Sequence, residues 1–137
     1  MSPQAQTKPA SQLREANHYK LCNGSLNIIY TANDLLGRPQ LNYQDGKQTQ
    51  NFVGDQIRRE ETALGLLVSV GAGASDLTPK YRFTLVLPRV LVGEQPAELT
   101  TFIVFENRSP IGRLPQPGPL ESYSVKSLSG TANTIIS

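Results

Sequence analysis

The chain has one cysteine, one histidine and no tryptophan among its 137 residues. A lone Cys22 excludes an internal disulfide, so a disulfide-stabilised secreted module is excluded and a reduced, cytoplasmic location is expected. One histidine and one cysteine cannot build a structural zinc site, which needs four nitrogen or sulfur ligands. On an extended strand, His18 and Cys22 would lie about 13 Å apart, too far for a nucleophile and its base. We therefore expect no metal, no cofactor and no catalytic residue.

The sequence also lacks an excess of charge of either sign. Thirteen Lys and Arg face eleven Asp and Glu, and the densest cationic pair, Arg58-Arg59, is followed directly by Glu60-Glu61. Without a basic stripe, nucleic-acid binding is not expected. No GxSxG, GxxxxGK or GxGxxG motif is present, and the glycine-rich stretch 71–75 does not lead into a GK[ST] signature. The sequence thus favours a protein that is not an enzyme.

Long apolar runs are missing as well. No stretch of about 18 uncharged apolar residues could span a bilayer, so membrane insertion is not expected. The first 20 residues contain no apolar segment typical of a secretory signal. Residues 1–17 lack apolar periodicity, which predicts a disordered N-terminal tail. Residues 18–137 are then predicted to form a single domain, a length that suffices for one core.

Turn signals and period-two alternation are what the sequence does contain. Asn23-Gly24 and Asp45-Gly46 predict two hairpins. The first joins strands over 18–22 and 25–32, and the second joins strands over 40–44 and 47–54. Between these hairpins, residues 33–40 leave room for a single helical turn.

Residues 56–71 allow two interpretations. Leu64, Leu66, Val68 and Val70 alternate with other side chains, which favours one strand. The composition of residues 56–66, rich in Glu, Arg, Ala and Leu, is compatible with a helix. The strand interpretation is preferred because the flanking segments are all of β type.

The longest apolar run, residues 81–92, has Pro88 in its middle. Proline cannot donate to a strand ladder, so it is confined to an edge, a strand end or a bulge. We expect one long strand that is kinked at Pro88. After the kink, Val90 and Val92 are predicted to face the core while Leu91 turns outward.

Two further strands are predicted towards the C-terminus. Residues 98–107 are apolar on both faces, which predicts a central strand that is covered on two sides. Residues 120–137 return to the β pattern, with Tyr123 and Val125 on one face and a break at Gly130. The fold class is therefore all-β, a single-domain antiparallel β-sandwich or a small closed β-barrel of seven to eight strands.

The aromatic residues supply the candidate binding residues. They occur about once per predicted strand, and in a closed barrel their inward rings would line an apolar pocket. An arginine of the Arg58-Arg59 pair that pointed into the lumen would contact an anion. The candidate ligand-binding residues are Tyr81, Arg82, Phe83, Tyr123 and Arg58.

Three functions follow, in order of preference. The first is a non-enzymatic domain that acts as a self-association or protein-interaction module through outward apolar residues such as Leu91, Phe102 and Val104. It is expected to be a homo-oligomer, by default a two-fold dimer. The second is a small barrel that binds an apolar small molecule in its interior. The third is a cofactor-free barrel enzyme that uses Tyr, Arg or Glu.

Overall fold

A computed structural model describes residues 14–70, 83–106 and 123–134. These residues form antiparallel strands and one short 3-10 turn, η2 (Gly54–Gln56), and contain no α-helix. The strands are β1 (Arg14–Glu15), β2 (His18–Asn23), β3 (Leu26–Thr31), β4 (Gln40–Asp45), β5 (Gln48–Val53), β6 (Ile57–Thr62), β7 (Gly65–Val70), β8 (Phe83–Leu87), β9 (Leu91–Val92), β10 (Ala97–Glu106) and β11 (Tyr123–Asn133). The prediction of an all-β antiparallel fold is confirmed.

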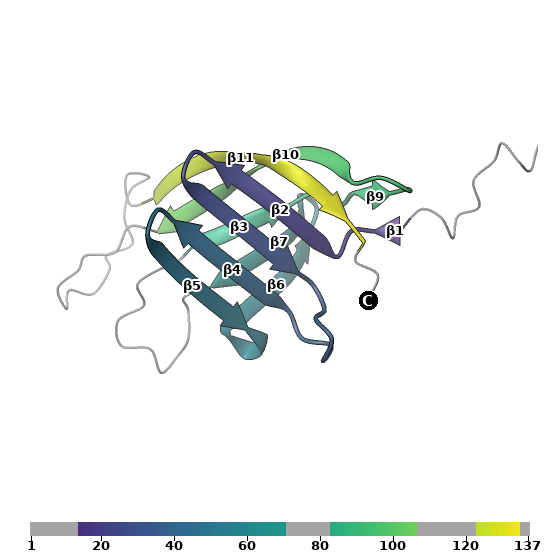
Figure 1. Cartoon of the computed structure of the whole chain (residues 1–137), viewed down its shortest axis with the longest axis horizontal. Coiled ribbons are helices and arrows are strands. Elements are labelled where there is room, and N and C mark those ends of the chain that lie inside the picture. The colour runs from purple at the N-terminus through teal and green to yellow at the C-terminus, as the bar shows by residue number, and fades with distance from the viewer. Residues whose placement is uncertain (1–13, 71–82, 107–122, 135–137) are drawn as a thin grey trace, which may run out of the picture.

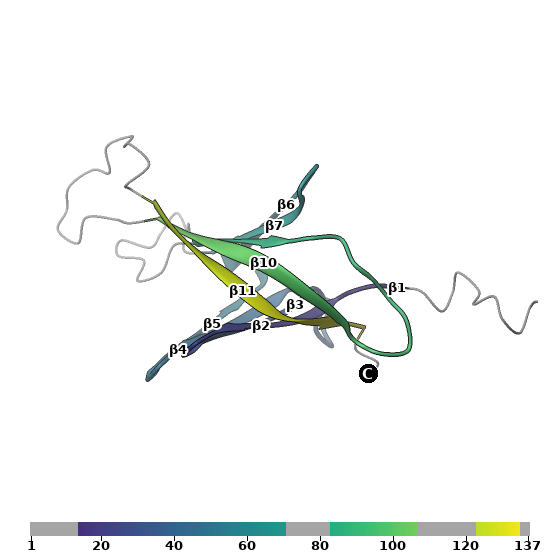
Figure 2. The ribbon, with the colours of Figure 1, turned by 90° about the horizontal axis from the view of Figure 1, so that it is seen from above.

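Nine of the strands form one sheet in the order β5-β4-β3-β2-β11-β10-β8-β7-β6. The sheet coils into a nearly closed barrel: β2 to β5 form one wall, β6 to β8 form the other, and β10 and β11 cross between them (Figures 1 and 2). The strand number slightly exceeds the seven to eight predicted. Because the two ends of the sheet do not pair, β5 and β6 are edge strands.

Both predicted hairpins are confirmed. Asn23 pairs with Leu26 and Asp45 pairs with Gln48, so each connection has two residues. Gly24 and Gly46, both with φ of 61°, take the left-handed conformation that such tight turns require. Asn23 and Asp45 end their strands with negative φ. Residues 33–39 form hydrogen-bonded turns, not a helical turn.

Residues 57–70 form strand structure, as preferred, but as a hairpin and not as a single strand. β6 and β7 pair antiparallel, with Thr62 opposite Gly65. Gly65 has φ of 124°, and a Cβ there would collide with the carbonyl oxygen of Leu87. Because Thr62 is opposite Gly65, Ala63 and Leu64 form the turn, and the exposed Leu64 does not belong to the core face.

The expectation of one long strand kinked at Pro88 is wrong. β8 ends at Leu87, and β9 pairs with β1 in a separate two-stranded sheet. A strand end is one of the places where proline fits, because its missing N–H breaks no ladder there. The predicted facing is confirmed for Val92, which is buried, and for Leu91, which is 60% exposed, whereas Val90 is only partly buried.

The segment predicted as a tail contributes to these contacts from Arg14 onward. Glu15 pairs with Leu91 through β1 and β9. The next two residues continue the contact, because the Ala16 N–H donates to the Val90 carbonyl at 3.2 Å and the Asn17 N–H donates to the Asn133 carbonyl at 3.1 Å. The earlier part of the predicted tail, residues 1–13, lies outside the described residues.

The C-terminal strands correct two further expectations. β10 is central, between β8 and β11, but its outer face is not covered, since Phe102 is 39% exposed. Gly130 does not break β11, which runs from Tyr123 to Asn133. A Cβ at Gly130 would overlap the carbonyl oxygen of Lys20, so glycine is what allows β11 and β2 to approach each other.

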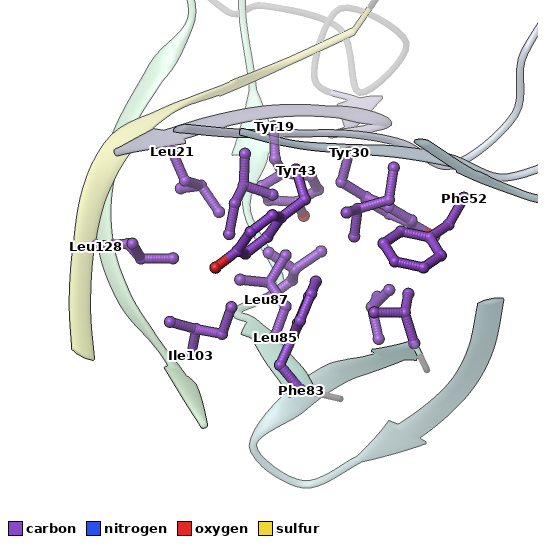
Figure 3. Close-up of a cluster of buried hydrophobic side chains, with 14 of the residues drawn as sticks. Tyr19, Leu21, Tyr30, Tyr43, Phe52, Phe83, Leu85, Leu87, Ile103 and Leu128 are labelled. Atoms are coloured by element: carbon purple, nitrogen blue, oxygen red, sulfur yellow. The ribbon is translucent and has the colours of Figure 1, made fainter. Parts of the chain in front are cut away.

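Large side chains from opposite walls meet inside the barrel (Figure 3). The Phe83 ring on β8 stacks on Tyr43 of β4, with centroids 5.2 Å apart, and contacts Phe52 and Phe105 at 6.3 and 5.9 Å. These rings join the two walls where the sheet itself is open. The other buried apolar residues of this core are Tyr19, Leu21, Leu26, Ile28, Tyr30, Leu41, Ile57, Val68, Val70, Leu85, Leu87, Ile103, Leu128 and Ala132.

Candidate functional site

The candidate ligand-binding residues that the structure describes do not lie together. Phe83 is 2% exposed and belongs to the aromatic core. Tyr123 is 48% exposed at the start of β11, and Arg58 is exposed on β6. Arg59 shares the inner face of β6 with the buried Ile57, whereas Arg58 alternates to the outer face. The other two candidates, Tyr81 and Arg82, lie outside the described residues.

A strip of apolar side chains runs across the outer face of four adjacent strands. Leu67, Val86 and Phe102 are neighbours in one row across β7, β8 and β10. Val104 and Val125 are opposite each other in the next row, and Tyr123 follows on β11. Phe102, Tyr123 and Val125 are 39%, 48% and 61% exposed. We name these six residues the outer strip.

The outer strip contains no charged residue. Where it meets polar positions on β7 and β8, the hydroxyls of Ser69 and Thr84 hydrogen-bond to each other at 2.9 Å. Because the two hydroxyls hydrogen-bond to each other, they can be covered by another apolar surface without losing that bond. Charges of the same face border the strip: Glu106 on β10 is opposite Tyr123, and Arg58 and Glu60 on β6 are opposite Ser69 and Leu67. The strip is therefore an apolar band with charge at its border, a pattern typical of protein contact surfaces.

A second feature is a hollow of about 60 Å³ at the barrel end where β8 stops. Arg89 spans it, with Nη1 2.8 Å from Glu15 Oε1 and Nη2 2.9 Å from Glu61 Oε2. The Tyr19 hydroxyl donates to the Pro88 carbonyl at 3.4 Å. The three charged side chains are more than half exposed, so each ion pair contributes little to stability. The hollow has room for about two water molecules, and its charges tie β1, β6 and the segment after β8 together.

The Tyr30 hydroxyl is a buried polar group that lacks a hydrogen-bond partner among the described residues. The Tyr30 side chain is fully buried, and no described residue hydrogen-bonds to its hydroxyl within normal limits. Burial raises the pKa of the Tyr30 phenol, and the nearby Arg59 guanidinium partly opposes that shift. Arg59 Nη1 itself donates to the Ala32 carbonyl at 3.3 Å, across the barrel from β6 to the end of β3.

Replacing Tyr30 by phenylalanine is expected to raise the free energy of unfolding by up to about 1 kcal/mol. The substitution keeps the ring and removes a buried hydroxyl that gains no hydrogen bond from the described residues. Chemical denaturation of the two proteins measures the difference. A loss of more than about 1 kcal/mol in Tyr30→Phe, of the size found for broken buried hydrogen bonds, would show that the hydroxyl has a partner after all.

The same substitution is expected to change the response to alkaline pH. The folded state holds the Tyr30 proton above the ordinary pKa of 10.0, whereas the unfolded chain loses it near that value. Stability is therefore complete below pH 10 and falls as the pH rises above 10. Tyr30→Phe removes this part of the fall. The variant still loses some stability above pH 10 because of Tyr19, whose pKa is also raised mainly by burial.

The remaining residues considered from the sequence form no reactive group. His18 Nδ1 lies 3.2 Å from the Thr31 hydroxyl, and burial, followed by the charge of Lys20, lowers its pKa. Cys22 is exposed on the same strand. Nowhere in residues 14–70, 83–106 and 123–134 do three His, Cys, Asp or Glu side chains gather at metal-binding distance. No helix of the described chain has the length and apolar character to cross a membrane.

Comparison of the chain with known protein families, curated protein sequences and solved structures finds no match.

Proposed function

We propose that this chain is a non-enzymatic self-association module, and that the outer strip packs against the outer strip of a second copy. The observation that carries the proposal is the exposure of Phe102, Tyr123 and Val125 on one face of two adjacent strands. Burying such a surface is favourable by roughly 25 cal/mol per Å². Each copy presents the same surface, so two strips can meet about a two-fold axis.

The size of the strip predicts a weak dimer. Six residues are far fewer than the 20–30 residues that each partner contributes to a standard interface. A dissociation constant of roughly 0.1–1 mM, equivalent to about 4–5.5 kcal/mol, is therefore expected. Association of this strength is reversible and depends on protein concentration.

Binding of an apolar molecule in the interior has less support. Side chains with 0–7% exposure come from both walls, and the Phe83 ring lies among three other aromatic rings. A ligand in this part of the barrel would have to displace them. Among the described residues, the exposed Glu15, Glu61 and Arg89 are the one cluster of charged side chains that could favour an enzymatic role.

Replacing Val125 by lysine is expected to weaken the dimer at least about tenfold. Val125 is 61% exposed, so lysine fits the folded monomer, but a charge within the strip must be desolvated on dimerisation. Sedimentation equilibrium over a range of concentrations measures the dissociation constant.

Ser129→Lys is the matched control, because Ser129 is exposed on the same face of β11 and lies outside the strip. It is expected to leave the dissociation constant unchanged. Equal effects of the two substitutions would mean that the strip is not the contact. A wild-type chain that stays monomeric at about 1 mM would reject self-association itself.

A further inference from the structure

The open barrel leaves two strand edges, and the edge at β6 is guarded against pairing. Residues 58–61 of β6 are Arg, Arg, Glu and Glu, and all four are exposed. A strand pairs antiparallel with its own copy about a two-fold axis normal to the sheet, so the residue on the axis faces itself. Charged side chains along an edge strand are one of the means by which proteins discourage pairing with another strand.

The edge at β5 has no such protection. Gln48–Val53 contains no charged residue and no proline. The Val53 N–H donates to Gln56 Oε1 at 3.0 Å, so it points away from β4. Because ladder groups alternate along a strand, the N–H and C=O groups of Asn51 and Thr49 point to the same open side. These backbone groups are free to pair with another strand within the described structure.

Charges of opposite sign stand at the two ends of this edge. Lys47 lies in the turn before β5 and Asp55 lies in η2 after it, and both are exposed. The midpoint between them in sequence is Asn51. Asp45, near the Lys47 end, lies on β4 one strand away from the edge and accepts a hydrogen bond from the Ser25 hydroxyl at 3.1 Å.

We propose that β5 pairs antiparallel with β5 of a second copy about a two-fold axis at Asn51. In this register an uncharged amide residue faces itself, and the Thr49 N–H can donate to the Val53 carbonyl of the second copy while the Val53 N–H keeps its hydrogen bond to Gln56. Lys47 of each copy then meets Asp55 of the other, so the two charged ends attract each other in both places. A two-fold axis at Gln50 instead would set Lys47 opposite the uncharged Val53, so the charges favour the axis at Asn51.

This contact is separate from the outer strip. β5 is one end of the nine-stranded sheet, whereas β10 and β11 are in its middle, on the other side of the barrel (Figure 1). The edge proposal therefore does not depend on the proposed strip contact, and the two can be tested independently in one set of variants.

The test uses the Val125→Lys chain, in which the strip contact is disabled. This protein is still expected to dimerise through β5 at low ionic strength. Lys47→Glu and Asp55→Lys, each added to it, are expected to raise the dissociation constant about tenfold, because each turns two attractions into two repulsions. The combination of both substitutions restores opposite charges at both ends and is expected to return the dissociation constant to its starting value.

Lys20→Glu is the control for net charge, since Lys20 is exposed on β2, far from β5 in the sheet order. It is expected to have no effect. The edge proposal is overturned if Val125→Lys is monomeric at about 1 mM, a result that leaves the strip proposal standing. It is also overturned if the single charge reversals have no effect, or if the combined reversal fails to rescue them; an extended segment of another protein would then be the better occupant of this edge.

Discussion

Replacing Phe83 by alanine is expected to lower the free energy of unfolding by about 3–5 kcal/mol, as for other large-to-small changes of a buried phenylalanine. The ring is 2% exposed and contacts Tyr43 and Phe52 of the opposite wall and Phe105 of β10. Its loss removes the contacts that join the walls across the unpaired seam between β5 and β6. Urea denaturation followed by circular dichroism measures the change.

Phe102→Ala is the matched control for Phe83→Ala. It deletes the same side chain from the outer face, where Phe102 is 39% exposed, and is expected to cost about 1 kcal/mol. Similar losses in the two variants would mean that Phe83 is not enclosed, and a ligand pocket beside it would regain support. A loss confined to Phe83→Ala agrees with a core that side chains already fill.

Replacing Gly130 by alanine is expected to cost about 3 kcal/mol or more, since overpacking of this kind costs 1–3 kcal/mol even where side chains yield. The new Cβ would overlap the backbone carbonyl of Lys20 on β2, and backbone yields less than a side chain. The strands β2 and β11 would have to separate at the pairs Gly130–Leu21 and Thr131–Lys20. Thermal and chemical denaturation test this, with amide hydrogen exchange of β2 as a local reading.

Gly24→Ala separates this steric effect from the ordinary cost of replacing glycine. Gly24 has φ of 61° and nothing within 4 Å of a built Cβ, so alanine there suffers only the conformational penalty. That penalty is about 1–2 kcal/mol. If Gly130→Ala costs no more than Gly24→Ala, the close approach of β11 and β2 is not the constraint that the structure indicates.

Local signals predicted the features that depend on a few neighbouring residues. The glycines of Asn23-Gly24 and Asp45-Gly46 determine their turns because positive φ is a property of the residue itself. Period-two alternation predicts that Phe83 and Leu85 lie on one face of a strand, because successive side chains of a strand point to opposite faces. Pro88 likewise had to leave the ladder, and it lies directly after the end of β8.

The hairpin of β6 and β7 was missed because its signal is weak. Its turn residues, Ala63 and Leu64, are not typical of tight turns, and the positive φ falls on Gly65 after the turn. A two-residue connection also moves the inner face from odd positions such as Ile57 to even positions such as Val68. If residues 56–71 formed a single strand, Leu64 would lie on the core face. In the structure Leu64 lies in the turn and is 70% exposed.

The sequence by itself determined the β class, the principal turns and the inward side of most strands, because those follow from backbone preferences and the alternation of side chains. Tertiary structure alone decided that β11 lies beside β2, that Arg89 meets Glu15 and Glu61, and that the outer face of β10 stays uncovered. These contacts join residues far apart in the chain, and no local preference specifies which strands meet. The same long-range pairing left β5 and β6 as the open edges of the sheet.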